Sequence, residues 1–261
     1  MKISIVTISF NQSRYIKKCI DSVLNQKNVE IEYIVVDPGS NDGSREIINS
    51  YGDRLIKIYQ PDKGPADGLN KGFQMATGEI FGFINSDDYF LEGSLQKVKN
   101  YFLENQKKTY ITGHGWIEDN RRGKKYRMYP STISKLKYAY DASKIFQQGT
   151  FFPAEFFYAA GGFNEMNNTC WDGELFANFA NLGLKHKVIN EDLAVFRIYS
   201  GSISGSYEVN AKYQADKNRI FKFLMGREIN YLDKIIISIL RPIFFILKKI
   251  KSTIYECENK H

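Results

Sequence analysis

Acids and amides follow three short apolar runs of the chain, at the point where each run ends. Asn11 follows the first run, Asp37 ends the second, and Asp87 and Asp88 come shortly after the third. In an open α/β sheet the ligand crevice lies outside the carboxyl ends of the strands, so these side chains would meet at one binding site. The alternative is that Asp and Asn only end strands and cap helices. Capping alone could explain any one of these positions, but it is a weaker explanation of all three together.

Two further carboxylates, Asp172 and Glu174, stand at the start of a segment with helical spacing of its apolar residues, 171–183. Acids in a first turn are favoured by the exposed N–H groups of a helix, so capping is the simpler interpretation of both. Two residues apart on a helix, their side chains diverge by about 200°. We therefore expect only one of them to face a ligand.

The elements that must position these residues alternate along the chain. Short apolar runs predict strands at residues 2–10, 31–37, 54–59, 80–84 and 109–117. Apolar spacings of three and four predict helices at residues 15–24, around 47–48, at 94–102 and at 171–183. This alternation predicts βαβ units, and hence a parallel sheet with helices on both faces.

Residues 62–78 form a glycine-containing segment that is predicted to pass from a loop into a helix. Its glycines allow a ligand to approach the backbone closely, and Asp67 and Asn70 would share one helix face. The segment matches neither the Walker pattern nor G-x-G-x-x-G. A dinucleotide fold is therefore not indicated.

Composition narrows the class of protein. The 261 residues carry a formal net charge of +7, but residues 211–261 hold 11 basic and 5 acidic side chains, and the rest of the chain is nearly balanced. A nucleic-acid binder would have its basic face in the folded body, so nucleic acid is not an expected partner. The three cysteines are unevenly spaced and the three histidines few, which argues against a disulfide framework and a zinc site.

Two basic segments need separate interpretation. Residues 121–127 contain five basic side chains in seven, which is typical of a solvated hairpin tip or of a loop that meets an anionic acceptor. The tail is apolar at 229–247 and then basic, so we expect residues 229–251 to lie on an anionic membrane surface, with a kink near Pro242. The alternative is a helix packed on the body or on a second copy in a homo-oligomer.

Three ordered segments resemble a known family. They read SIVTISFNQSRYIKKCIDSVLNQ, IEYIVVDPGSNDGS and DKGPADGLNKGFQMATGEIFGFINSDD, and are followed by GGFNE and WDGELF. The set resembles glycosyltransferase family 2. That resemblance implies an α/β GT-A fold, with a Rossmann-like, mostly parallel sheet flanked by helices and a C-terminal amphipathic helical tail. It also implies a catalytic domain at 1–210, divided into a nucleotide-sugar half (1–90) and an acceptor half (91–210), before the tail at 211–261.

The resemblance implies roles for individual residues on the donor side. The nucleotide-binding residues would be Thr7, Phe10, Asn11, Asp37, Asp67, Asn85 and Ser86. Asp37 would accept the imide N–H of a uracil, since a carboxylate is an acceptor. Asn85-Ser86-Asp87 stands at the D-x-D position of the family, where the last acid holds a divalent metal ion, Mn²⁺ or Mg²⁺. Because the first acid is replaced by Asn85, the metal would rest on Asp87, helped by Asp88.

On the acceptor side the resemblance implies Asp172 as the general base, with Glu174 as its rival because the acid that usually precedes the base is Trp171 here. Arg197 or Tyr199, in a segment similar to the closing loop of the family, would reach the diphosphate. The implied function is an inverting, metal-dependent transferase that uses a nucleoside-diphosphate sugar, and a UDP-sugar first.

The implied acceptor is a glycan or a lipid-linked glycan of surface polysaccharide synthesis. The implied location is the cytoplasm, peripheral to the inner face of the cell membrane. Two alternatives stay open at this point: a non-catalytic nucleotide- or sugar-binding module, and a sugar nucleotidyltransferase. The second would carry a Gly-rich loop after the first strand, where this chain reads SFNQSRYIKK.

Overall fold

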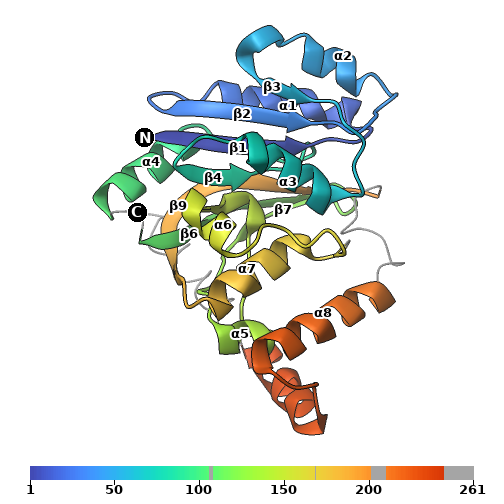
Figure 1. Cartoon of the computed structure of the whole chain (residues 1–261), viewed down its shortest axis with the longest axis vertical. Helices are drawn as coiled ribbons and strands as arrows, with labels where there is room; N and C mark the ends of the chain where they lie inside the picture. The colour runs from blue at the N-terminus through green and yellow to red at the C-terminus, as the bar shows by residue number, and fades with distance from the viewer. Residues whose placement is uncertain (106–107, 168, 201–209, 244–261) are drawn as a thin grey trace.

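The computed structural model describes residues 1–105, 108–167, 169–200 and 210–243 (Figure 1). Strands and helices alternate through the first half of the chain. The strands there are β1 (Lys2–Ile8), β2 (Glu30–Val36), β3 (Ile56–Ile58), β4 (Ile80–Phe83) and β5 (Tyr89–Phe90). The helices are α1 (Ser13–Leu24), α2 (Ser44–Asn49), the short 3₁₀ turn Gly52–Arg54, α3 (Pro65–Met75) and α4 (Ser94–Glu104).

The second half begins with strands and ends with helices. Its strands are β6 (Thr109–Asp119), β7 (Lys124–Met128), β8 (Thr150–Pro153) and β9 (Lys185–Ile198). Its helices are α5 (Lys135–Ala139), the 3₁₀ turn Gln147–Gly149, α6 (Ala154–Ala159), α7 (Trp171–Asn181) and α8 (Asn210–Met225). The strands and helices expected from the sequence are present, with ends that differ by a few residues.

The nine strands of the described residues join one sheet, in the order β3-β2-β1-β4-β8-β6-β9-β5, with β7 paired to β6. The first four neighbours are parallel, as βαβ units require. Beyond β4 the pairing is mixed: β8 runs antiparallel to β4 and to β6, whereas β6 and β9 are parallel. The α/β class is thus confirmed, and the continuous parallel part is confined to residues 2–83.

Helices cover both faces of the sheet because successive strand residues point to opposite sides. On β1, Ile3 and Ile5 pack with α1 and α4, while Val6 packs with α3, α6 and α7 on the other face. Phe73 of α3 stands at the centre of that second layer, with the rings of Phe81 and Phe157 each 4.8 Å away, centroid to centroid. Much of the aromatic content of the chain is therefore core packing.

The basic run 121–127 covers the tip of the β6–β7 hairpin and the start of β7. Arg121 and Arg122 both lie within ion-pair distance of Asp119, at the base of the turn. The segment is thus an exposed hairpin tip, and contact of this loop with an anionic acceptor stays a prediction.

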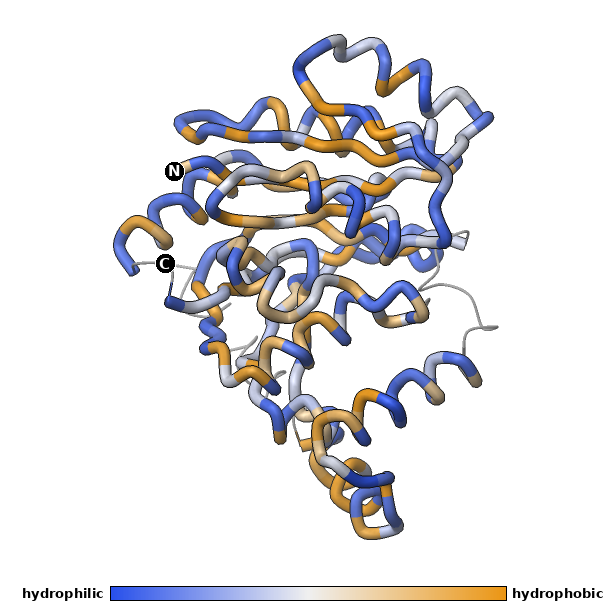
Figure 2. The backbone as a smooth tube through the Cα atoms, viewed as in Figure 1, coloured by the Kyte–Doolittle hydropathy of each residue, from blue (hydrophilic) through white to orange (hydrophobic). Residues whose placement is uncertain are grey.

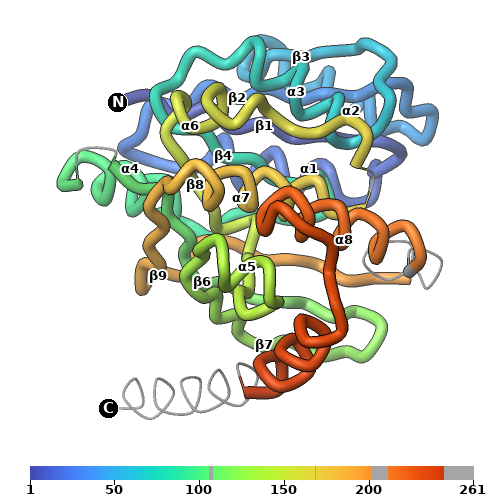
Figure 3. Tube along the Cα trace, turned by 60° about the horizontal axis from the view of Figure 1, so that its bottom comes forward, coloured from blue at the N-terminus to red at the C-terminus, as the bar shows by residue number. Residues whose placement is uncertain are grey.

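The tail folds back onto the body (Figure 3). Ile220 and Leu224 of α8 are buried against Ala177 of α7, and a further helix runs through residues 231–243. That helix is tied to the body by Asp233, which is 1% exposed and accepts hydrogen bonds from Arg227 and from the hydroxyl of Tyr140. Residues 244–251 of the predicted membrane segment lie outside the described residues. Among the described helices, none has the length and apolarity needed to cross a membrane.

Candidate functional site

The carboxyl ends of β1, β2 and β4 meet at one edge of the sheet, because the three strands are parallel neighbours. Ile8 pairs with Val36, and Val6 pairs with Phe83. The loop after β4 then continues along β1, with the Ser86 N–H 3.3 Å from the Ile8 carbonyl oxygen. We call the loops that follow these three strands, together with the start of α3, the strand-edge site.

Asp37 is fully buried at this edge and its carboxylate is satisfied within its own loop. Its Oδ1 accepts from the Ser40 N–H (2.8 Å) and from Arg45 Nε (3.0 Å), and its Oδ2 accepts from the Ser40 hydroxyl (2.5 Å). Asp37 therefore fixes the turn of residues 37–45. A nucleobase N–H would share Oδ2 with the Ser40 hydroxyl.

The loop after β1 presents a different pair of side chains. Asn11 has a positive φ of 53° and bonds the loop after β2 twice, through its N–H to the Ser40 hydroxyl and through its Oδ1 to the Asn41 N–H. Phe10 beside it is 60% exposed. Thr7, by contrast, is fully buried, and its hydroxyl accepts a hydrogen bond from Tyr33 (3.1 Å). The Thr7 side chain thus points into the core.

The first turn of α3 and the loop before it hold two acids, Asp67 and Asp62, in different environments. Asp67 accepts from the Lys63 N–H (2.8 Å) and from Lys71 Nζ (2.9 Å). Burial acts to raise the pKa of Asp67, but these hydrogen bonds outweigh it and lower that pKa. Asp62 is not among the residues predicted from the sequence, and burial raises its pKa. Its Oδ2 would lie 2.8 Å from a Cβ placed at Gly68, so the glycine makes room for this carboxylate.

Asn85, Ser86 and Asp87 form the turn directly after β4. The hydroxyl of Tyr199 lies 3.1 Å from Asp87 Oδ2 and 3.2 Å from Gln12 Oε1, and can donate to either. Burial raises the pKa of Asp87, against the effect of the Tyr199 hydrogen bond. Asn85 Oδ1 is a buried oxygen without a hydrogen-bond partner in the described structure, while Ser86 is 4% exposed.

Asp88 is fully buried, and each of its carboxylate oxygens is already used. Oδ1 accepts from the Arg197 N–H and Oδ2 from Gln148 Nε2, both at 2.8 Å. Burial first, and then the neighbouring Asp87 carboxylate, raise the pKa of Asp88 well above its usual value. This geometry makes Asp88 the residue that joins the turn after β4 to the end of β9.

Arg197 enters the strand-edge site from β9, more than one hundred residues after β4. Its guanidinium carbon is 5.0 Å from the ring centroids of both Tyr15 and Tyr89. The side chain is 7% exposed, and its Nε and Nη2 atoms have no hydrogen-bond partner among the residues that the structure describes. An unsatisfied buried guanidinium is costly. In the sequence, only the family resemblance of its segment selected Arg197.

On α7, Asp172 and Glu174 have opposite surroundings. Asp172 is half-buried and accepts from the adjacent Gly173 N–H (2.8 Å), with no side-chain partner in the described structure. Burial therefore raises the pKa of Asp172. The amino-terminal end of α7, which carries Asp172, lies at the end of the molecule toward which β1 and β4 run (Figure 1).

Glu174 is paired on both oxygens. Arg219 of α8 binds it in a bidentate manner, with Nη2 2.7 Å from Oε2. Asn164 and Asn167 donate to the same carboxylate at 3.0 and 2.6 Å. Burial alone would raise the pKa of Glu174, but the Arg219 and asparagine hydrogen bonds lower it below its usual value. A carboxylate held in this way is a poor proton acceptor, whereas Asp172 is free to take a proton.

Among the described residues, no three His, Cys, Asp or Glu side chains are placed to share a metal ion. The oxygens that suit Mg²⁺ or Mn²⁺ at the strand-edge site are the Asp87 carboxylate and the unpartnered Asn85 Oδ1. These oxygens fit a divalent ion that takes its other ligands from water and substrate phosphates.

With fold and geometry established, comparison with known proteins identifies the class. The sequence profile of Glycosyl transferase family 2 matches residues 4–160. The chain therefore belongs to glycosyltransferase family 2, as the resemblance of its motifs implied.

Similar curated proteins are named as glycosyltransferases. An uncharacterized glycosyltransferase of Nostoc sp. is 37% identical over 106 residues, which cover 39% of this chain and 33% of that protein. The putative teichuronic acid biosynthesis glycosyltransferase TuaG of Bacillus subtilis is 32% identical over 116 residues, or 43% of this chain and 46% of TuaG. The matched region thus spans less than half the length of these relatives.

Solved structures share the fold over most of the chain. TarS of S. aureus, residues 1–349 in complex with UDP-GlcNAc, superposes with a TM-score of 0.71 over 92% of this chain and 71% of that one, at 18% identity. The mannosyltransferase PcManGT of Pyrobaculum calidifontis, in complex with GDP-Man and Mn²⁺, gives a TM-score of 0.66 over 92% and 68%, at 14% identity. At these identities the likeness confirms the GT-A architecture.

Proposed function

We propose that this protein is an inverting glycosyltransferase that moves a sugar from a nucleoside-diphosphate sugar to a hydroxyl of a glycan or lipid-linked acceptor in surface polysaccharide synthesis. The observation that carries the proposal is the unpaired Asp172 carboxylate at the start of α7, beside a neighbour, Glu174, that is fully paired. The names of TuaG and of the UDP-GlcNAc complex of TarS support polysaccharide synthesis and a UDP-sugar donor.

The strand-edge site is the proposed donor site. The exposed Phe10 ring is placed to stack on a nucleobase, and Asn11 and Asp37 hold the two loops on which the base would rest. Asp67 orients the start of α3 toward the ribose and diphosphate. We propose a supporting role for Thr7 and Ser86, through the packing of β1 and of the turn after β4, because both side chains are buried.

Asp87 is the proposed metal ligand, with Asn85 Oδ1 as the second oxygen of the chain. When bound, Mn²⁺ or Mg²⁺ would offset the charge of the departing nucleoside diphosphate. The Mn²⁺ of PcManGT supports a divalent ion in this fold. Asp88 is better placed to position Asp87 than to bind metal, because both of its oxygens already accept hydrogen bonds.

The chemical step requires a general base for the acceptor hydroxyl and no nucleophile from the protein. Asp172 takes the proton of the acceptor hydroxyl, and the oxygen attacks C1 of the donor sugar while the C1–O bond to the diphosphate breaks. The single displacement inverts the anomeric centre through an oxocarbenium-like transition state. The raised pKa of Asp172 makes it a stronger proton acceptor than an ordinary aspartate.

A donor screen tests this proposal against its alternatives. The purified full chain is incubated with UDP-, GDP- and dTDP-sugars in MnCl₂ or in EDTA, and the released nucleotide is identified. We expect slow release of a nucleoside diphosphate from one donor, lost in EDTA. Release of pyrophosphate from a nucleoside triphosphate and a sugar phosphate would instead indicate a nucleotidyltransferase. Nucleotide binding with no turnover of any donor would indicate a non-catalytic module.

We also propose that the protein binds the inner face of the cell membrane from the cytoplasm, through the helix at residues 231–243. Tyr231, Leu232 and Ile239 are 77%, 66% and 53% exposed, and Figure 2 shows hydrophobic residues along this helix. Lys234 and Arg241 are exposed on the same helix, which suits an anionic surface.

Flotation with phosphatidylglycerol vesicles tests this surface in the full chain. We expect the parent protein to float with anionic vesicles and not with phosphatidylcholine alone. Leu232→Glu combined with Ile239→Glu should abolish flotation, and Leu103→Glu, at a 59% exposed residue of α4, should not. Equal flotation of the tail variant and the control would remove the membrane role and leave packing on a second copy.

A further inference from the structure

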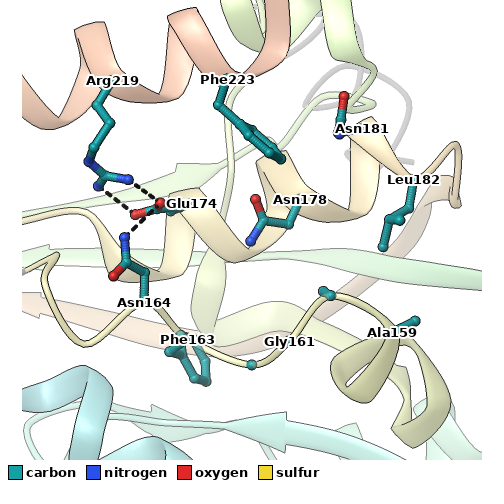
Figure 4. A pocket seen from close by; sticks show the side chains of 12 residues that line it. Ala159, Gly161, Phe163, Asn164, Glu174, Asn178, Asn181, Leu182, Arg219 and Phe223 are labelled. Carbon is teal, nitrogen blue, oxygen red and sulfur yellow. Dashed lines mark hydrogen bonds and ion pairs between the residues drawn. The ribbon is translucent and has the colours of Figure 1, made fainter.

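A groove of about 560 Å³ lies between α7, α8 and the loop that precedes α7, outside the strand-edge site (Figure 4). Glu174 and Arg219 close one end of it, and Leu182 lies toward the other. The backbone of Gly161 forms part of a wall, and a Cβ placed there would meet nothing within 4 Å. The groove thus offers an open space along one side of α7.

The groove carries no uncompensated charge. The Glu174 carboxylate is neutralised by the bidentate guanidinium of Arg219, and the other lining residues are neutral. A phosphate would need an unpaired cation, and a free cation would need an unpaired acid. The described lining residues include no unpaired cation and no unpaired acid, so the charges of the groove favour a neutral ligand.

The groove also has polar and aromatic surfaces together. The Asn178 side chain points into the space between α7 and the glycine loop in Figure 4, and makes no hydrogen bond in the described structure. Its amide can both donate and accept. Phe223 of α8 is 52% exposed, and its ring lies beside Asn178. An apolar helix would leave the amide unsatisfied, whereas a sugar ring offers hydroxyls to the amide and an apolar face to the phenyl ring.

The position of the groove relates it to the reaction. Glu174 and Asp172 both belong to the first turn of α7, but their side chains diverge by about 200° around the helix, so an acceptor chain in the groove would reach the proposed base by passing the amino-terminal end of α7. From Glu174 to Asn181 it extends roughly 10 Å along the helix, at 1.5 Å per residue. Both α7 and α8 lie outside residues 4–160, which match the family profile.

We propose that this groove, which we call the α7–α8 groove, binds the neutral carbohydrate chain of the acceptor, at sugar residues beyond the one whose hydroxyl reacts. The inference rests on the proposed transferase function and adds the acceptor class: an oligosaccharide rather than a single sugar. Asn178 recognises hydroxyl groups, Phe223 stacks on a ring face, and the Glu174–Arg219 pair fixes the distance between the two helices.

The test uses direct binding, so it does not depend on turnover. Neutral p-nitrophenyl glycosides of hexoses and N-acetylhexosamines, from mono- to tetrasaccharides, are titrated into the full chain and followed by saturation-transfer NMR. We expect at least one tetrasaccharide glycoside to bind more tightly than its monosaccharide. Phe223→Ala and Asn178→Ala should each weaken that tetrasaccharide by about tenfold, the loss of one aromatic contact or one satisfied amide, with monosaccharide binding unchanged.

Matched controls are Leu103→Ala and Asn100→Ala on the exposed side of α4, which should bind as the parent does. Equal tetrasaccharide affinity in the parent and in both groove variants would overturn the inference, as would the absence of neutral oligosaccharide binding at millimolar concentration. Donor release in the metal-dependent screen reports separately on the proposed function. It should be unchanged in Phe223→Ala and Asn178→Ala.

Discussion

The carboxylates of the strand-edge site and those on α7 differ in where their hydrogen-bond partners lie in the sequence. At the strand edge, Asp37 and Asp67 accept hydrogen bonds from residues within eight positions in the chain. On α7, Glu174 is paired with Arg219, 45 residues later, while Asp172 is paired with no side chain in the described structure. Paired acids build loops and hold helices together. The unpaired acid with a raised pKa is the one available for proton transfer.

The largest effect expected from this contrast is the loss of the base. We expect Asp172→Asn to lower the rate of transfer by about 10³-fold, because an amide cannot take the acceptor proton. Affinity for the donor nucleotide, measured by calorimetry, should stay at the parent value, since the strand-edge site is intact. Transfer at a normal rate in this variant would rule out Asp172 as the base.

Removal of the proposed metal ligand should have the next largest effect. Asp87→Ala is expected to weaken Mn²⁺-dependent donor binding and to lower transfer by about 10²-fold, because the diphosphate charge is no longer offset. Binding in EDTA should be the same for parent and variant. If the parent binds its donor equally well with Mn²⁺ and with EDTA, Asp87 has no metal role.

Breaking the ion pair between Glu174 of α7 and Arg219 of α8 should lower the stability of the fold. Glu174→Gln is expected to lower the free energy of unfolding at pH 7 by about 1–2 kcal/mol, a discounted value because Arg219 is 42% exposed. The folded-state pKa of Glu174 is depressed from 4.5, so its contribution is present above 4.5 and is lost as pH falls through the depressed value. Urea unfolding should therefore show the two proteins converging at low pH. A difference that persists there would point to packing instead.

The smallest effect is expected from removal of the Tyr199 hydroxyl, which donates a hydrogen bond to Asp87. Tyr199→Phe removes a hydrogen bond that lowers the Asp87 pKa, so the Mn²⁺-dependent binding of donor should be lost at a higher pH than in the parent. At pH 7 we expect a decrease of about fivefold at most, the worth of one hydrogen bond. A pH dependence identical to that of the parent would show that Tyr199 does not act on Asp87.

The same contrast explains how much the sequence could predict. The parallel strands, the meeting of their carboxyl ends and the helix at 171–183 follow from apolar runs and local spacing. The partners of Asp37 lie within its own turn, and the turn chemistry of residues 37–44 was visible in the sequence. Asp172 and Glu174 could be ranked only by resemblance, because Arg219 comes from a different helix.

Other features depended on tertiary contacts that no local pattern encodes. The hydroxyl of Thr7 is held in the core by Tyr33, which lies 26 residues later in the chain. Both carboxylate oxygens of Asp88 accept hydrogen bonds from residues far away in the chain, Arg197 and Gln148, at separations of 109 and 60 residues. Residues 211–261 are predicted as a tail after the catalytic domain, with packing on the body as one alternative, and the helix α8 packs on α7 and supplies one wall of the α7–α8 groove.

The most direct test of the central claim is the pH dependence of transfer in the parent and in Glu174→Gln. We predict an acid limb in kcat/KM at a pH above the ordinary Asp value of 3.8, because the base must be deprotonated and the pKa of Asp172 is raised. The limb should keep its position in Glu174→Gln. An acid limb that disappears or moves in Glu174→Gln would contradict the assignment and make Glu174 the base.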